Sequence, residues 1–153
     1  MAKFLAMFPG QGSQFVGMGK ELCAEFKVAA QAFEEAEDHA KIPLRKLCFE
    51  GPEDSLKLTA HTQPCILATS IATWRVLQAE TEIKPSFYAG HSLGEYSAVV
   101  AAEVLDFGRA SYLVHQRGTA MQKAVPEGIG AMAAVMNVPA DDLLAKCKDI
   151  SEE

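Results

Sequence analysis

Two kinds of hydrophobic spacing alternate along this chain. Residues 4–8 form an apolar run between Lys3 and a Pro-Gly break at 9–10, and residues 86–89 form a second short run. Runs this short and this apolar predict buried strands, and buried strands are typical of a parallel sheet with helices on its faces. The pattern therefore predicts an α/β protein.

The stretches between and after these runs have helical spacing. Residues 27–40 carry an apolar face opposite a strongly acidic one, which predicts an amphipathic helix. The apolar face consists of Val28, Ala32 (or Phe33), Ala36 and Ala40. Further helices are predicted over 64–79, over 95–104 and, with Asp106 as N-cap, up to about residue 124. The remaining predictions are a turn over 51–54, a strand over 129–138 and a helix that opens at 139–142.

Composition narrows the class of protein. The chain has 153 residues, 49% hydrophobic and 22% charged, so we expect one folded domain rather than disorder. A net charge of -6 repels a phosphate backbone and argues against nucleic-acid binding. The first apolar run is too short for a signal peptide or a membrane span, so we expect a cytoplasmic protein. The four cysteines lack zinc-site spacing, so no metal is expected.

The sequence Gly-His-Ser-Leu-Gly at 90–94 matches the G-x-S-x-G elbow, in which a tight strand-to-helix turn lifts a serine hydroxyl clear of the sheet. Small flanking residues are needed because the turn has no room for side chains. The pattern alone is weak, but it falls at the predicted strand-to-helix junction. We therefore interpret Ser92 as a nucleophile in preference to an incidental Gly-Ser turn.

Such a serine needs N–H donors for the oxyanion of its intermediate. The backbone N–H of Leu93 lies at the predicted helix start and is one candidate. The second is Gln11, which lies between two glycines in the loop that leaves the first strand's carboxyl end. The alternatives for this loop are a plain turn or a phosphate-binding loop, although the nucleotide-binding spacing is absent.

Arg117 is the least expected residue for its place. The apolar stripe of its helix runs through Ala110, Leu113, Val114 and Met121, and Arg117 falls on the same face. Because an unpaired buried guanidinium is costly, it must pair with an internal acid or bind an anionic ligand, whose carboxylate fits its planar fork. Beside a serine acyl-transfer site, a carboxylate on the acyl group is the better interpretation.

The sequence offers no convincing general base for Ser92. His39 lies on the acidic helix, and His61 precedes the next predicted helix, where a capping or surface role is sufficient. His91 is the neighbour of Ser92 on a strand end, where side chains alternate, so we expect it to point away. His115 lies on another face of its helix from the arginine.

With these residues assembled, the chain resembles the malonyl-CoA:acyl carrier protein transacylase family of type II fatty acid synthesis over essentially its whole length. Six short motifs in family order carry the resemblance: residues 8–14, 62–64, 90–97, 116–118, 121–122 and 128–133.

The resemblance implies a ping-pong transfer of malonyl from malonyl-CoA to the phosphopantetheine thiol of acyl carrier protein, through a malonyl ester of Ser92. It implies no bound cofactor; the coenzyme A thioester is the substrate and acyl carrier protein the partner. The Gln11 and Leu93 positions provide the oxyanion-hole amides, and the Arg117 position pairs with the malonyl carboxylate. Three further matches lie near the acyl pocket: Gln63, His91 and Met121.

The family fold is a hydrolase-like parallel-sheet core with an inserted ferredoxin-like subdomain. By resemblance, residues 1–127 belong to the core and 128–153 to the first strand and helix of the insert. The family's catalytic histidine and its orienting residue come from a later stretch, and the family is roughly twice as long. We therefore expect a fragment that exposes apolar surface and is largely inactive alone. We also expect it to be poorly soluble or oligomeric, or to need its C-terminal half as a partner.

Two other functions fit part of the pattern. A serine esterase of the α/β-hydrolase type would use the elbow but not Arg117. A non-catalytic half that binds acyl carrier protein would need a local basic patch, for which Lys41, Arg45 and Lys46 are the candidates, because both proteins are acidic.

Overall fold

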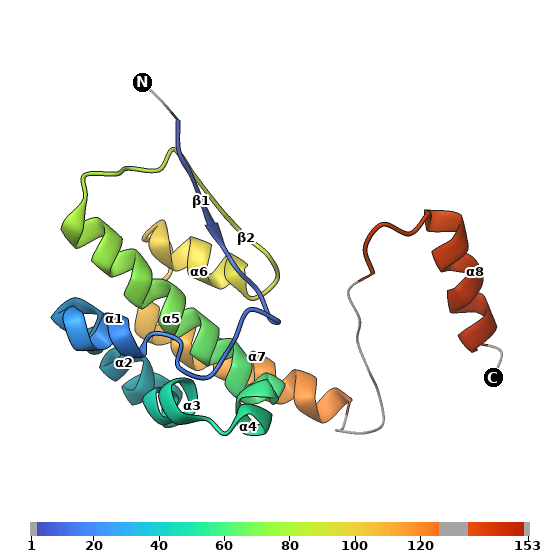
Figure 1. Cartoon of the computed structure of the whole chain (residues 1–153), viewed down its shortest axis with the longest axis horizontal. Helices are drawn as coiled ribbons and strands as arrows, with labels where there is room; N and C mark the ends of the chain where they lie inside the picture. Colours follow the sequence, from blue (N-terminus) through green and yellow to red (C-terminus); the bar gives the residue numbers. More distant parts are fainter. Residues whose placement is uncertain (1–2, 126–134, 152–153) are drawn as a thin grey trace.

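The structure is a computed structural model and describes residues 3–125 and 135–151. Within these residues a small parallel sheet is combined with a mostly helical fold (Figure 1). The elements are β1 (Leu5–Phe8), α1 (Lys20–Glu25), α2 (Lys27–Ala40), α3 (Leu44–Glu50), α4 (Glu53–Lys57), α5 (Thr59–Glu80), β2 (Phe87–Gly90), α6 (Gly94–Ala101), α7 (Phe107–Ala124) and α8 (Ala140–Ser151).

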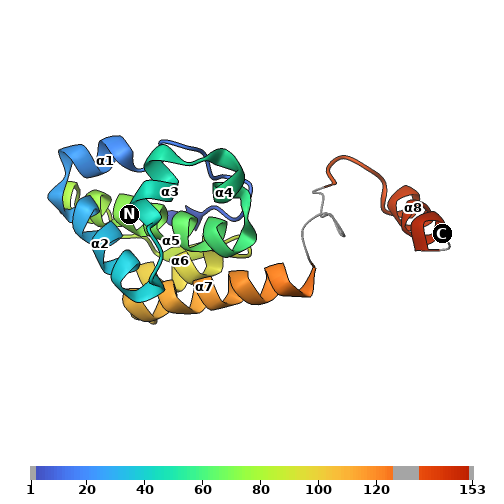
Figure 2. The same ribbon diagram turned by 90° about the horizontal axis from the view of Figure 1, so that it is seen from below.

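Helices α2, α5 and α7 form the main core. Helix α5 runs through the middle of the molecule, with α7 on one side and the short helices α3 and α4 on the other (Figures 1 and 2). The buried face of α2 consists of small residues around one aromatic ring: Ala29, Ala32, Phe33, Ala36 and Ala40. Gly118 of α7 lies so close to the start of α5 that an added Cβ would be 2.6 Å from the Thr59 carbonyl oxygen. Small residues therefore let these helix backbones approach one another closely.

The two strands form a parallel pair in which Leu5 is opposite Phe87 and Phe8 is opposite Gly90. One face of this sheet is covered, because Phe8 packs with α6, and the Trp74 ring of α5 meets Phe8 and Tyr88 edge-on at centroid distances of 6.2 and 5.8 Å. The other face is open, and three side chains are more than half exposed on it: Leu5, Met7 and Phe87. The sheet is thus covered on one side only within the described residues.

Several predictions from the hydrophobic pattern are confirmed. Both strands are present, the second one residue later than predicted, and α2 has the predicted bounds. The Asp106 carboxylate caps α7 by accepting a hydrogen bond from the Arg109 N–H at 2.8 Å. The predicted α/β class with a parallel sheet is therefore found, in a mostly helical form.

Other boundaries were wrong. Helix α5 begins at Thr59, five residues before the predicted start, and encloses Pro64, because packing against α3, α4 and α7 outweighs the lost backbone hydrogen bond. Helix α6 ends at Ala101 rather than 104, shortly before Glu103 takes a left-handed φ of 60°. The predicted turn over 51–54 already contains the first residues of α4.

The structure describes only some of the residues for which C-terminal elements were predicted. Of the strand predicted over 129–138, residues 129–134 lie outside the described residues, and 135–138 are not in a strand. The helix after Pro139 is present as α8, with Asp141 and Asp142 in its first turn, and stands apart from the other helices in Figure 1. The domain boundary at 127/128 and the ferredoxin-like insert stay predictions. None of the helices in the described ranges is long and apolar enough to cross a membrane.

Candidate active site

Ser92 lies at the tip of a sharp turn between β2 and α6. Its φ of 52° is in the left-handed region, which a non-glycine residue adopts only where the surrounding structure imposes it. The flanking glycines explain the constraint: a Cβ on Gly90 would lie 2.0 Å from Gly94 backbone atoms, and one on Gly94 would lie 2.2 Å from the Phe8 carbonyl oxygen. The turn therefore has the geometry of a nucleophile elbow.

The Arg117 side chain connects α7 to this turn. Its guanidinium donates one hydrogen bond to Ser92 Oγ at 3.2 Å and another to Gln63 Oε1 at 2.5 Å. The Tyr96 ring lies beneath it, 5.8 Å from the guanidinium carbon. Within the described residues, no carboxylate forms an ion pair with Arg117. The cation is thus held beside the hydroxyl by neutral groups, which leaves its charge available to an anion.

Gln63 is fully buried on α5 and orients the arginine. Its Nε2 donates to the Met121 sulfur at 3.2 Å while its Oε1 accepts from Arg117. The sequence-predicted residues Gln63, Ser92, Arg117 and Met121 are therefore neighbours. The predicted apolar stripe of α7 is confirmed in part. Ala110 and Val114 are buried, but Leu113 is 44% exposed, and the buried face continues through Ser111 and Gly118 instead.

The loop after β1 approaches the same end of the sheet. Gln11 Nε2 donates to Thr59 Oγ1 at 3.1 Å, and the Thr59 N–H donates to Gln122 Oε1 at 3.1 Å. The first turn of α5 is thus tied to both the loop and α7. Ser13 closes the loop through a hydrogen bond from Oγ to the Gly10 carbonyl oxygen at 2.8 Å.

Two backbone donors remain uncommitted at this edge. Among the described residues, the N–H groups of Gln11 and Leu93 make no hydrogen bond. The Leu93 side chain is fully buried in the main core, which fixes the backbone just after Ser92. Both N–H groups are therefore free to donate hydrogen bonds to a developing oxyanion.

Three of the four histidines lie within hydrogen-bond distance of backbone carbonyl oxygens away from Ser92. The Nδ1 atoms of His39, His61 and His115 lie 2.8 to 2.9 Å from the carbonyl oxygens of residues 35, 55 and 40. The His91 ring is beside Gly10, where an added Cβ would be 2.8 Å from its Nδ1. In the described part of the chain, no histidine hydrogen-bonds to Ser92, so no general base is in place on the serine hydroxyl among these residues.

The candidate basic patch is partly neutralised. Arg45 forms ion pairs with Glu37 at 2.6 Å and with Glu34 at 3.3 Å. The hydrogen bond that Arg45 donates to the Glu37 carboxylate raises the pKa of Arg45 above its ordinary value. Of the candidate patch, only Lys41 and Lys46 are therefore left without an acid partner among the described residues.

Sequence reasoning missed three residues that hold the site. Tyr96 lies within the elbow motif, and its ring position beneath Arg117 follows from one helical turn beyond Ser92. Thr59 gave no usable signal, and Gln122, although it belongs to the 121–122 motif, was given no role, because their pairing depends on how α5 crosses α7.

Comparisons with known proteins place this geometry in a family. Residues 6–151 match the acyl transferase domain family. The malonyl CoA-acyl carrier protein transacylase of Bacillus subtilis (strain 168) is 48% identical over 153 residues, which are 100% of this chain and 48% of that protein.

Solved structures agree. An acyl carrier protein S-malonyltransferase from Vibrio cholerae O1 biovar eltor str. N16961 is similar with a TM-score of 0.86 at 46% identity, covering 97% of this chain and 48% of that one. A malonyl-transacylase solved in complex with a type II PKS acyl-carrier protein gives a TM-score of 0.89 at 47% identity, covering 98% and 48%. The chain therefore belongs to the acyl transferase family, and it spans about half the length of the malonyl CoA-acyl carrier protein transacylases that it is similar to.

Proposed function

We propose that this chain carries the nucleophile and the carboxylate-binding side of a malonyl transferase that moves malonyl from malonyl-CoA to the phosphopantetheine thiol of acyl carrier protein. The observation that carries the proposal is the hydrogen bond from Arg117 to Ser92 Oγ, since no acid neutralises that cation among the described residues. A neutral acyl group has no use for such a charge, whereas a malonyl carboxylate matches its two-pronged donor set.

In the first step, Ser92 Oγ attacks the thioester carbonyl carbon. A C–O bond forms and the C–S bond breaks, so that coenzyme A leaves as a thiol with the proton that the serine gives up to a base. The amides of Gln11 and Leu93 stabilise the negative charge on the carbonyl oxygen. The carrier thiol then attacks the malonyl ester in the reverse sense and regenerates the serine.

Arg117 must exchange its bond to Ser92 for the malonyl carboxylate when substrate binds. Gln63 supports this exchange, because it holds one arm of the guanidinium at 2.5 Å and is itself fixed by burial. The remaining arm can turn from the hydroxyl toward the carboxylate. This exchange also releases the serine oxygen for attack.

The base comes from outside the described residues. The relatives are about twice as long as this chain, and a transacylase needs a general base to take the serine proton. We assign that base to the part of the relatives that follows the matched stretch. Without that part, these 153 residues should show little turnover.

The test combines this chain with the part of the Bacillus subtilis (strain 168) transacylase that follows the matched stretch, here called the relative's second half. After co-expression, the mixture is exposed to malonyl-CoA or acetyl-CoA and examined by intact mass spectrometry. We expect a malonyl adduct that Ser92→Ala abolishes. Arg117→Ala should lower the preference for malonyl over acetyl by roughly 10- to 100-fold, the value of one lost charged hydrogen-bond pair.

Arg117→Lys is the matched control, because it keeps the charge and loses the planar fork. Its preference for malonyl over acetyl should lie between those of the parent chain and Arg117→Ala. An unchanged preference for malonyl in Arg117→Ala would contradict the proposal. Acylation by neutral esters with no preference for the carboxylate would instead favour a serine esterase.

A further inference from the structure

The loop that carries the Gln11 N–H is tied to the helical core by one side chain. Two side-chain hydrogen bonds of 2.8 Å join residues of the loop to one another. Among the described residues, the bond from Gln11 Nε2 to Thr59 Oγ1 at 3.1 Å is the only hydrogen bond that joins residues 10–14 to another part of the molecule. The position of the loop therefore depends on how Thr59 is held.

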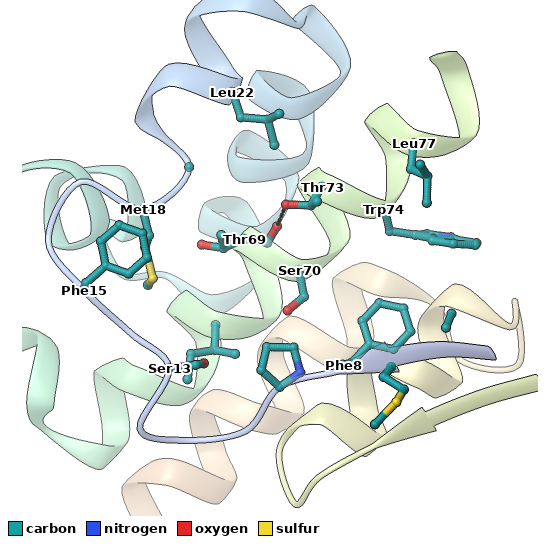
Figure 3. A pocket seen from close by; sticks show the side chains of 15 residues that line it. Phe8, Ser13, Phe15, Met18, Leu22, Thr69, Ser70, Thr73, Trp74 and Leu77 are labelled. Carbon is teal, nitrogen blue, oxygen red and sulfur yellow. Dashed lines mark hydrogen bonds between the residues drawn. The ribbon is translucent and has the colours of Figure 1, made fainter. Parts of the chain in front are cut away.

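Packing supports the far side of this loop only in part. Ser13 and Phe15 line a cavity of about 620 Å³, whose other walls include β1 and the middle of α5 (Figure 3). The Phe15 side chain is more than half exposed within the described ranges. Because the loop lacks close packing on this side, its hydrogen bond to Thr59 is needed to fix its position.

Helix α7 holds Thr59 through both of its backbone polar groups. The Thr59 N–H donates to Gln122 Oε1 at 3.1 Å, and an added Cβ on Gly118, one helical turn before Gln122, would be 2.6 Å from the Thr59 carbonyl oxygen. Helix α5 begins at Thr59, and its N-cap residue, Leu58, makes no side-chain capping bond. Gln122 thus supplies, from another helix, an acceptor that the first N–H groups of a helix need.

Helix α7 carries Arg117 as well as Gln122. The Arg117 guanidinium donates to Ser92 Oγ at 3.2 Å, while Gln122 binds the first turn of α5. One helix therefore positions the cation beside the serine and, through Thr59 and Gln11, a proposed oxyanion donor. The proposed mechanism gives Gln122 itself no role.

We propose that Gln122 is a positioning residue for the oxyanion hole. It holds Thr59, which in turn holds the Gln11 side chain and so directs the Gln11 N–H toward the thioester oxygen. The inference rests on the proposed function. The negative charge develops only in the transition state and the intermediate, so a displaced donor lowers the rate of acylation rather than the binding of substrate. Malonyl and acetyl thioesters develop the same oxyanion, so the loss applies equally to both.

Gln122→Leu is the first test, because it removes the acceptor and keeps a side chain of similar size. In the chain alone, we expect faster amide exchange over residues 10–13. In the co-expressed mixture with the relative's second half, acylation of Ser92 should slow by about 10-fold, with KM and the preference for malonyl over acetyl unchanged. Removing an oxyanion donor outright costs about 100-fold or more, so a displaced donor should cost less.

Two further variants serve as controls. Gln122→Glu keeps an oxygen acceptor at the same place and should restore slow exchange and fast acylation. Gln31→Leu is the same substitution at an exposed position of α2 and should change neither. Circular dichroism and thermal melting establish that each variant folds.

A double variant shows whether Gln122 acts through Thr59. Thr59→Val keeps the N–H that donates to Gln122 but removes the hydroxyl that accepts from Gln11. If the effect passes through that hydroxyl, Gln122→Leu causes no further loss of acylation rate in the Thr59→Val background. A glutamine that only caps α5 would instead lower the melting temperature and leave the rate unchanged.

Three results would overturn the inference. One is a Gln122→Leu variant with unchanged loop exchange and acylation, and another is a loss of rate that adds in full to that of Thr59→Val. The third is a loss confined to malonyl-CoA, because Gln122 would then act through Arg117. A parent mixture without a preference for malonyl would contradict the proposed function alone, since acylation by acetyl-CoA still measures the oxyanion hole.

Discussion

The helical core and the sheet of this molecule differ in how completely they are covered. Phe33 and Leu67 in the core have no exposed surface, and small residues allow α2, α5 and α7 to meet closely. The sheet has a covered face beside α6 and an open face on which Met7 is 76% exposed. The difference shows that the helices bury their apolar faces against one another, whereas one face of the two-stranded sheet stays exposed within the described residues.

The candidate active site lies where these two regions meet. Arg117 and Gln63 come from helices of the completed core and are fixed by mutual hydrogen bonds. Ser92 and Gln11 come from the carboxyl ends of the two strands. The side chains proposed to bind the acyl carboxylate therefore come from the buried helical core. The serine, which needs a base, comes from the sheet, which is covered on one face only within the described residues.

The largest expected effect contrasts a core residue with one on the open face. Phe33→Ala removes a fully buried ring that packs 5.2 Å from Phe49, and should lower the free energy of unfolding by about 3–5 kcal/mol. Met7→Ala should change it by less than about 0.5 kcal/mol. Urea denaturation of both variants measures the difference, and equal losses would break the comparison.

A somewhat smaller effect is expected where the elbow touches the sheet. In Gly94→Ala, the new Cβ would lie 2.2 Å from the Phe8 carbonyl oxygen, so α6 must move away from β1. We expect a loss of about 1–3 kcal/mol and a displaced Ser92, measured by thermal melting and by acylation in the co-expressed mixture. Glu95→Ala, at the exposed next position, is the control and should retain acylation. Unaltered acylation in Gly94→Ala would show that the close contact does not define the elbow.

Thr59→Val should loosen the Gln11 loop without disturbing the core. The substitution keeps the shape and the N–H bond to Gln122 but removes the hydroxyl that accepts from Gln11. We expect a loss of about 1 kcal/mol or less and faster amide exchange over residues 10–13. Thr73→Val, whose hydroxyl bonds only within α5, should leave that exchange unchanged. Equal exchange in both variants would exclude Thr59 as the anchor of the loop.

The smallest effect is a pH dependence at the surface. Lys57 donates a hydrogen bond to Glu53 at 2.8 Å and lowers the pKa of that carboxyl. A lowered pKa in the folded state means that the pair stabilises the fold above the ordinary carboxyl pKa, and that this stabilisation is lost as pH falls through the lowered value. Glu53→Gln should therefore differ slightly from the parent in unfolding at neutral pH and coincide with it in strong acid. A larger difference in acid would reverse the sign of the argument.

Local pattern was enough to predict α2 and the two strands, because a repeating apolar face and glycine-bounded apolar runs each act over a few neighbouring residues. It failed for α1, α3 and α4, which have five to seven residues and are too short for a periodic signal. The early start of α5 was also missed, because the proline rule for helix starts is local and the packing that overrides it is not.

In the candidate site, too, features set by neighbouring residues could be predicted and contacts between distant residues could not. The elbow motif predicted the conformation of Ser92, because the turn needs glycines at positions 90 and 94 and these lie only two residues from the serine. Arg117 was singled out because it lies on the predicted apolar face of its helix, of which only part is buried. Its contact with Ser92 depends on how α7 crosses the end of the sheet. The link from Thr59 to Gln122 joins residues 63 positions apart, and such a contact leaves no local signal.

The central proposal is that this chain supplies a positioned serine and its carboxylate-binding arginine, while its described residues contain no base. The most direct measurement is the rate at which malonyl-CoA acylates Ser92, followed by rapid-quench intact mass spectrometry of the chain alone and of its complex with the relative's second half. We predict fast acylation in the complex and a rate at least about 1,000-fold lower in the chain alone, the usual cost of losing a triad member. Equal rates in the two samples would contradict the claim, because the described residues would then contain the base.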